Sequence, residues 1–215
     1  MILTMALVVD RYVLGAAQEN CYAIRVDRRA AEAAVIDPGD GAAQLRLELA
    51  GMGARCAGIL ITHCHWDHLM GVADLAEGTG SPVHVPELER PVLERPREFF
   101  PDIPLRSYEG AKGVNGGDTV EVAGISFDVV SIPGHSPGHV AYCADGCLFS
   151  GDLLFAGSVG RTDLPFSDWE TLLESIRMLF ERFPPETVVY PGHGPETTLG
   201  AEQQTNPFLT ELRIA

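Results

Sequence analysis

Three histidines and one aspartate lie within a single six-residue stretch of the chain, from His63 to His68. In an extended backbone the side chains alternate between two faces, so His63, His65 and Asp67 point to one side. A helix that begins here brings His68 to the same side. Imidazole nitrogens and carboxylate oxygens bind metals, and four such groups directly after an expected buried strand at Ala57–Thr62 predict a metal site.

Three more chelating residues each follow an expected strand and a glycine. They are His135 in Pro133-Gly134-His135, Asp152 in Ser150-Gly151-Asp152 and His193 in Pro191-Gly192-His193. Taken singly, each motif is an ordinary turn; beside the first cluster, the three motifs predict further ligands. A carboxylate can bridge two cations with its two oxygens, which an imidazole cannot do, so we expect Asp152 to bridge a two-metal centre.

The rest of the sequence predicts the strands that position these residues. Short β-branched runs alternate with helical stretches and with Gly/Pro turns, which is typical of an α/β protein. The expected strands are Leu7–Leu14, Asn20–Val26, Ala33–Ile36, Ala57–Thr62 and Pro82–Val85, then Thr119–Val122, Ile125–Ile132, His139–Cys143, Cys147–Phe149 and Thr187–Tyr190. This order favours two sheet-plus-helix halves packed into one unit.

Helices are expected at Ala42–Met52 and Leu69–Glu77, and a third after Ser167. The segment Ser167-Asp168-Trp169-Glu170 matches the capping box S-x-x-E, which predicts Ser167 as the N-cap of a helix that ends near Phe183. Prolines recur between Pro86 and Gly117 and prevent a long helix there, so this is the least regular part of the chain.

Charge excludes several kinds of partner. The 215 residues carry 15 basic and 30 acidic side chains, which gives a net charge of −15. Nucleic acids and anionic membrane surfaces attract basic proteins, so we expect neither as a partner. The chain has no apolar run near the roughly 20 residues that span a bilayer.

The start of the chain and its cysteines favour a cytoplasmic protein. Met1–Val9 is apolar but lacks the basic region of a signal peptide, so we expect a first strand there instead. The five cysteines are scattered and odd in number, which suits a reducing cytoplasm better than a disulfide framework.

The order of the ligand motifs resembles that of the metallo-β-lactamase superfamily. HxHxDH at 63–68 is followed by Pro-Gly-His, Ser-Gly-Asp and Pro-Gly-His. The chain is similar, more narrowly, to the glyoxalase II-like hydrolases, especially their short stand-alone members, which residues 150–158 and 160–164 also resemble. The resemblance covers nearly the whole chain and implies an α/β fold, the four-layer αβ/βα sandwich, with 1–215 as a single domain.

The resemblance also implies which residues hold the metal. It assigns three ligands to each of two divalent ions: His63, His65 and His135 to one, and Asp67, His68 and His193 to the other. Asp152 and a hydroxide would bridge the two ions, so Asp67 and Asp152 are the residues implied in catalysis. We expect zinc, although mixed His/Asp ligation also suits iron and manganese.

The implied reaction is hydrolysis of a small-molecule thioester of the hydroxyacylglutathione type by the bridging hydroxide. Glyoxalase II proper adds a C-terminal helical domain with glutathione contacts, which we expect this chain to lack. The family's Glu-Tyr after the last ligand histidine is Gly194-Pro195 here, which leaves glutathione recognition open. Arg161 falls about where such enzymes place a cation and either meets a substrate carboxylate or is a plain surface arginine.

Other activities share parts of this pattern. Persulfide dioxygenases have the same His-Cys-His-x-Asp-His and Gly-Arg-Thr-Asp segments but use one iron held by two histidines and a carboxylate, and this alternative stays open. True β-lactamases lack the bridging aspartate. RNA-processing nucleases of the superfamily share HxHxDH, but the net charge of −15 disfavours them. The sequence makes no prediction of the oligomeric state.

Three neighbouring residues have two interpretations each. Asp37 either orients a ligand or forms the turn before Pro38-Gly39. His139 either donates a hydrogen bond to a ligand or pairs within its own turn. Cys64 points away from the ligands in an extended segment and lies in the core or directly behind them.

Overall fold

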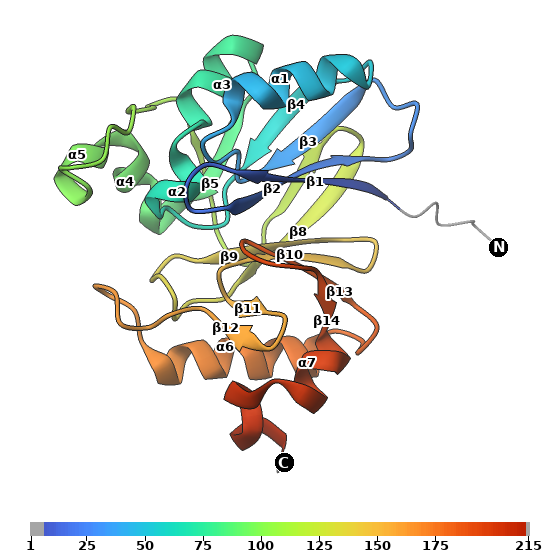
Figure 1. The fold of residues 1–215 in the computed structure, drawn as a ribbon, viewed down its shortest axis with the longest axis vertical. Coiled ribbons are helices and arrows are strands. Elements are labelled where there is room, and N and C mark those ends of the chain that lie inside the picture. The colour runs from blue at the N-terminus through green and yellow to red at the C-terminus, as the bar shows by residue number, and fades with distance from the viewer. Residues whose placement is uncertain (1–6, 214–215) are drawn as a thin grey trace.

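The computed structural model describes residues 7–213, which form two halves that each consist of a sheet with helices on its outer face (Figure 1). The first sheet has the strands β1 Val8–Leu14, β2 Glu19–Arg25, β3 Glu32–Ile36, β4 Arg55–Leu60, β5 Val83–Pro86 and β6 Lys112–Val114, in that order. The second has the order β14-β13-β10-β9-β8-β7, with β7 Thr119–Val122, β8 Ile125–Ser131, β9 Val140–Ala144, β10 Cys147–Gly151, β13 Val188–Pro191 and β14 Thr197–Thr198. A small hairpin pairs β11 Leu154–Phe155 with β12 Ser158–Val159.

The helices are short except for α1, α3 and α6. The α-helices are α1 Ala42–Gly51, α2 Trp66–Leu69, α3 Val72–Thr79, α4 Arg90–Glu94, α5 Pro96–Phe99, α6 Trp169–Arg182 and α7 Leu199–Thr205. Two 3-10 helices are η1 Glu87–Glu89 and η2 Pro207–Arg213. In the described part of the chain, no helix combines the length and apolar character needed to cross a membrane.

Three apolar layers hold the fold together. Leu45 of α1 and Leu75 of α3 pack on the outer face of the first sheet, and Leu172 of α6 packs on the outer face of the second. Between the sheets, the ring of Phe127 lies edge-on to those of Tyr142 and Phe149, with centroids 6.5 and 6.4 Å apart. The helix–sheet–sheet–helix order is visible from top to bottom of Figure 1 and confirms the predicted four-layer αβ/βα sandwich.

Strand direction in the first sheet determines where the polar residues collect. β3, β4 and β5 are mutually parallel, so their carboxyl ends lie at the same edge. Asp37 follows β3, the 63–68 segment follows β4, and Glu89 follows β5.

The second sheet delivers its residues to the same place. β8 and β10 are both antiparallel to β9, and β10 is parallel to β13, so β8, β10 and β13 run in one direction. The loops after these strands carry His135, Asp152 and His193. Both sheets therefore present their chelating residues at one end of the strands.

The predicted strands are all formed, with ends within two residues of the expected ones; the very short β6, β11, β12 and β14 were not predicted. The strand expected at Met1–Val9 lies mostly outside the described residues, and β1 begins at Val8. The helix expected at Leu69–Glu77 is divided into α2 and α3 by Gly71, which packs against the backbone of the 38–42 segment.

The predicted capping box is wrong by one residue. The Ser167 hydroxyl donates to the Leu164 carbonyl oxygen at 2.7 Å and closes its own turn. Asp168 is the N-cap of α6 instead, because its carboxylate accepts the Thr171 amide N–H at 2.8 Å. The end of the helix at Arg182, next to Phe183, agrees with the prediction.

Gly134 provides a test of how the loop before His135 is packed. Its φ is +132°, and a side-chain carbon there would overlap the backbone of Leu172 in α6. Gly134→Ala should lower the free energy of unfolding by about 2–4 kcal/mol, because the backbone strain of alanine at this φ and its steric overlap with Leu172 are both unfavourable. The matched control is Gly146→Ala, at φ +77° with no described atom within 4 Å, which should cost only about 1 kcal/mol. Equal losses in urea unfolding would contradict the packing.

Candidate metal centre

The structure brings the seven predicted ligands together at the shared edge of the two sheets. Their nitrogen and oxygen atoms form three overlapping sets, in each of which all ligand atoms lie within 4.8 Å of one another: His63/His65/His135, His63/His68/Asp152 and Asp67/His68/His193. The first and third sets are the two triplets that the resemblance implies. The second contains Asp152 with one histidine from each triplet.

Three imidazoles crowd together in the first set. His65 Nδ1 lies 2.8 Å from His135 Nε2 and 3.1 Å from His63 Nε2. A nitrogen can donate its proton to only one neighbour, so lone pairs in this set face one another without a proton between them. A cation placed among the three nitrogens would satisfy all of them.

Asp152 borders both sets. Its Oδ2 lies 3.6 Å from His135 Nε2 and 3.5 Å from His193 Nε2, and its Oδ1 lies 3.5 Å from His68 Nε2. His193 Nε2 is also 3.2 Å from Asp67 Oδ2. The position of Asp152 between the triplets is the one that a bridging carboxylate requires.

The donor set fits a metal pair. Two ligand atoms, His68 Nε2 and Asp152 Oδ1, are buried and have no hydrogen-bond partner among the described residues. Buried polar atoms without a partner are costly, and a cation would satisfy both. Gly192 keeps the space beside them open, because a side-chain carbon at this position would overlap Asp152 Oδ1.

The rings are fixed through their second nitrogens. His135 Nδ1 lies 2.9 Å from the Arg161 carbonyl oxygen, and His63 Nδ1 lies 3.1 Å from the Thr62 hydroxyl. His68 Nδ1 lies 3.0 Å from Asp37 Oδ2. Such partners set the tautomer and the orientation of metal-binding histidines, leaving Nε2 free for the metal.

Asp37 therefore fits both of its interpretations. Its carboxylate holds His68 and also accepts the Thr62 amide N–H at 2.8 Å and the Thr62 hydroxyl at 2.7 Å. Its backbone has a φ of +48°, a conformation that a non-glycine residue rarely adopts, before the turn at Pro38-Gly39. The turn supplies the orientation that the carboxylate needs.

Burial keeps the first set of histidines neutral. It lowers the pKa of His65 to about 4 and also lowers the pKa values of His63 and His135, because a charged imidazole is poorly solvated there and its neighbours repel it. Neutral imidazoles have a lone pair available for a metal at neutral pH.

The carboxylates reverse this effect on the other side. Burial alone would lower the pKa of His68, but Asp152 and Asp37 raise it well above the usual histidine range. The pKa of Asp152 is held well below that of an ordinary carboxyl group in spite of its burial, because His68, His193 and His135 surround it. Asp152 is therefore ionised, as a bridging ligand must be.

Two acidic residues near the ligands were missed in the sequence. Glu19 is fully buried, with Oε1 3.7 Å from His68 Nδ1, and neither of its oxygens has a hydrogen-bond partner among the described residues. Glu89 is buried behind the 63–65 segment and accepts the Cys64 amide N–H at 2.6 Å. The available signal for Glu89 was its place just after a strand parallel to β4.

His139 and Cys64 differ in outcome. The backbone of His139 pairs within its turn, because its carbonyl oxygen accepts the Ile132 amide N–H at 2.9 Å. Its side chain donates no hydrogen bond to a ligand: both ring nitrogens are buried without a hydrogen-bond partner among the described residues, and the ring lies against His63 with centroids 4.6 Å apart. Cys64 is a free, buried thiol in the core behind the first sheet, as expected.

The backbone and the side chain of Arg161 have different partners. The backbone carbonyl holds His135, while the side chain is 63 % exposed and forms two hydrogen bonds with Asp163, at 2.7 and 2.9 Å. A shallow pocket of about 360 Å³ lies beside it, lined by residues 158–163 with Trp169 and Phe208. Substrate binding by Arg161 stays a prediction.

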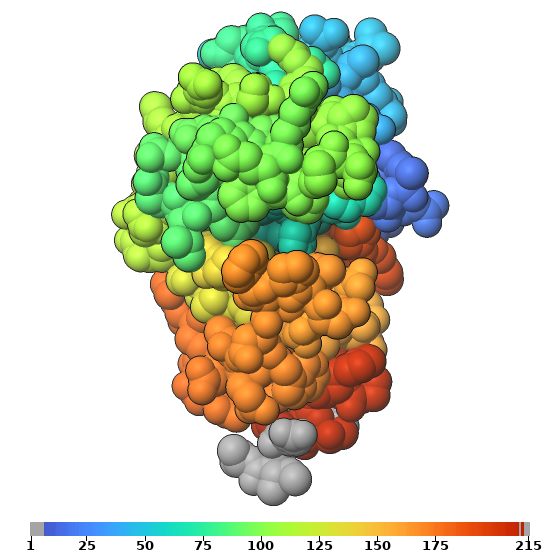
Figure 2. All heavy atoms as spheres, turned by 90° about the vertical axis from the view of Figure 1, so that its left-hand side faces the viewer, coloured from blue at the N-terminus to red at the C-terminus, as the bar shows by residue number. Residues whose placement is uncertain are grey.

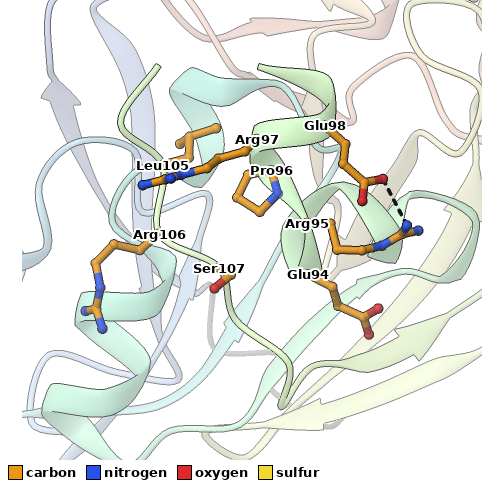
Figure 3. Close-up of a pocket in the computed structure, with 8 residues that line it drawn as sticks. All are labelled: Glu94, Arg95, Pro96, Arg97, Glu98, Leu105, Arg106 and Ser107. Carbon is orange, nitrogen blue, oxygen red and sulfur yellow. Dashed lines mark hydrogen bonds and ion pairs between the residues drawn. The ribbon is translucent and has the colours of Figure 1, made fainter. Parts of the chain in front are cut away.

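The surface around the site is formed by both halves. Figure 2 shows green residues of the 85–110 region above orange residues of the 155–168 region, with a teal patch, the colour of residues near 65, between them. A larger hollow of about 500 Å³ is lined by residues 94–98 and 105–107, and Figure 3 shows Arg95 reaching toward Glu98 along its wall. None of the seven predicted ligands lines this hollow.

The low pKa of His65 makes the metal-free protein sensitive to acid. Below about pH 6.5 the unfolded chain binds a proton that the folded protein does not bind until about pH 4, so stability falls as pH falls. His65→Gln should reduce the slope of unfolding free energy against pH by up to about 1.4 kcal/mol per unit in this window. Urea unfolding in chelator at pH 5 and 7 measures it, and a slope identical to the wild type would contradict the assignment.

Comparison with known proteins agrees with this geometry. The model of the "Metallo-beta-lactamase superfamily" matches residues 14–193. Hydroxyacylglutathione hydrolase GloC of Haemophilus influenzae is 31% identical over 205 residues, which cover 89% of this chain and 93% of GloC.

Two solved structures are also similar over their full length. The B3 metallo-beta-lactamase BLEG-1 has a TM-score of 0.87 and 35% identity, and the alignment covers 94% of this chain and 100% of that one. TTHA1623, solved in a di-iron-bound form, has a TM-score of 0.82 and 40% identity with the same coverage. With the His/Asp cluster, these relatives indicate a metal-dependent hydrolase. The chain belongs to the metallo-beta-lactamase superfamily.

Proposed function

We propose that this chain hydrolyses small-molecule thioesters with two divalent metal ions held by its His/Asp cluster. The observation that carries the proposal is the position of Asp152, whose oxygens lie 3.5–3.6 Å from histidines of both triplets. A pair of ions held there would lower the pKa of a shared water from 15.7 toward about 7 and so supply a nucleophile at neutral pH.

The chain's own residues prepare the site for this reaction. Burial works against the ionisation of Asp67, but the neighbouring His193 and His68 lower its pKa, so its carboxylate is ionised and available to hold a metal ion. Asp152 stays ionised for the same kind of reason. The leaving thiolate has an ordinary pKa near 8.5 and departs without a strong acid.

Two observations support a thioester of the acylglutathione type as the substrate: the name of a relative and the position of Arg161. The name of GloC, hydroxyacylglutathione hydrolase, describes action on a thioester, and this chain shares 31% of its residues over most of both lengths. We propose a substrate of that type, with its carboxylate bound by Arg161 in place of Asp163.

Zinc is the metal we propose; the di-iron form of TTHA1623 makes iron the main alternative, and manganese is a further one. The free cysteines suit a cytoplasmic location, which we also propose.

One observation favours a second candidate, an iron-dependent persulfide dioxygenase. The set His63/His68/Asp152 combines two histidines and one carboxylate, the ligand type of non-haem iron oxygenases. In this reading one iron is bound and the remaining ligands only support it.

Metal analysis and parallel assays of the purified protein separate these activities. The proposal expects two metal equivalents and turnover of lactoylglutathione. One iron per chain with oxygen uptake on glutathione persulfide would overturn it in favour of the dioxygenase. Cleavage of a chromogenic cephalosporin with no thioester hydrolysis would overturn it in favour of a lactamase such as BLEG-1.

Asp152→Ala should abolish hydrolysis and reduce binding to one metal equivalent, because both triplets lose their shared carboxylate. The loss should exceed the 10- to 100-fold typical of residues behind the ligands. Metal content and initial rates measure it, with Asp128→Ala, an exposed position on β8, as the control. Full activity of Asp152→Ala would sink the assignment.

Arg161→Ala should raise KM for an acylglutathione about 10-fold while kcat changes little, because a charge-assisted contact is lost away from the reacting bond. Asp163→Asn should lower KM, since it removes the ion pair that holds the Arg161 guanidinium away from the substrate. An unchanged KM in both variants would make Arg161 a plain surface arginine.

A further inference from the structure

A single buried carboxylate connects the two loops that carry the three-histidine set. Glu89 ends η1, just after β5, and is only 5 % exposed. Its Oε2 accepts the Cys64 amide N–H at 2.6 Å, and its Oε1 accepts the Gly138 amide N–H at 2.8 Å and the Ser136 hydroxyl.

These partners lie directly beside the ligands. Cys64 stands between His63 and His65 in the chain, and Ser136 follows His135. The contacts therefore join a segment of the first half to a segment of the second, at the point where His65 Nδ1 and His135 Nε2 come within 2.8 Å. Shifts of either segment would change that spacing.

The loop around residue 138 is shaped for this carboxylate. A side-chain carbon at Gly138 would lie 2.7 Å from Glu89 Cγ, so only glycine allows the approach. Three donors on one buried carboxylate compensate its desolvation, and none of the seven ligands is used to do so.

We propose that Glu89 is a positioning residue that sets the spacing of His63, His65 and His135 and thereby the metal affinity of this set. It touches no ligand side chain through its own hydrogen bonds and acts through the backbone of the two loops. The inference deepens the proposed dinuclear centre and rests on it, but it does not depend on the substrate.

Two variants remove part of the hydrogen bonding of Glu89. In Glu89→Gln the amide oxygen can still accept from Ser136 and Gly138, but the amide NH₂ then faces the Cys64 N–H, donor against donor. Ser136→Ala removes one of the three bonds and leaves the carboxylate in place. The matched control is Glu87→Gln in the same 3-10 helix, because Glu87 is 44 % exposed and pairs with Arg90 at the surface.

Titration of the metal-free proteins with Co²⁺, followed by absorption, tests the proposal. Wild type and Glu87→Gln should bind two equivalents with equal affinity. Glu89→Gln should bind one equivalent normally and the other about 10- to 100-fold more weakly, and Ser136→Ala should show a smaller loss at the same step. In a His193→Ala background, which removes a ligand of the other set, Glu89→Gln should weaken the remaining equivalent by the same factor.

Unchanged Co²⁺ binding in both Glu89→Gln and Ser136→Ala would overturn the proposal. So would an equal weakening of both equivalents that follows a lower free energy of unfolding of the metal-free variants in urea, since that is the mark of a purely structural residue. Cobalt binding needs no thioester, so failure of thioester hydrolysis would defeat the proposed function and leave this inference standing.

Discussion

Lone pairs of the buried ligand atoms face one another where the two sheets meet, which is unfavourable unless cations lie between them. His65 Nδ1 lies close to two other imidazole nitrogens, and Asp152 lies among histidines from both triplets. Single protons cannot lie between all the nitrogens of the three-histidine set, and His68 Nε2 has no hydrogen-bond partner within the described chain. Cations would satisfy these atoms, and the surrounding fold holds the ligands in the positions that cation binding requires.

The arrangement is held by contacts between the two halves. The Tyr22 hydroxyl donates to the Pro191 carbonyl oxygen at 2.7 Å, which ties the loop before His193 to the first sheet. Two groups of the second sheet hold the segment before His63 in turn. The Val140 amide N–H donates to the Thr62 carbonyl oxygen at 2.9 Å, and the Tyr142 hydroxyl donates to the Ile61 carbonyl oxygen at 3.0 Å. The ligands of one half are thus positioned by the other, so the centre exists only when both sheets are packed together.

The sequence predicted most of the fold and the ligand set, because both are carried by local patterns. Strands show in runs of β-branched residues, and chelating side chains show by type and by place after a strand. The error at Ser167 arose because two neighbouring residues can each cap a helix, and the turn to Leu164 decides between them. The division at Gly71 depends on tertiary packing against the 38–42 segment.

The residues that the sequence did not reveal contact backbone groups, or lie near the ligands without a hydrogen bond to them. Glu89 binds backbone amide groups of Cys64 and Gly138, which every residue type except proline offers, so no motif marks it. Glu19 is identified only by its burial near His68. The outward turn of the Arg161 side chain toward Asp163 likewise follows from loop geometry.

The proposed dinuclear centre requires Asp152 to lie between two metal ions. Anomalous diffraction from crystals of the metal-loaded protein would locate these ions. Two anomalous peaks are expected about 3.5–4 Å apart, one on each ligand triplet, with an Asp152 oxygen in contact with both. A single peak, with either triplet left without metal at full loading, would contradict the proposed centre.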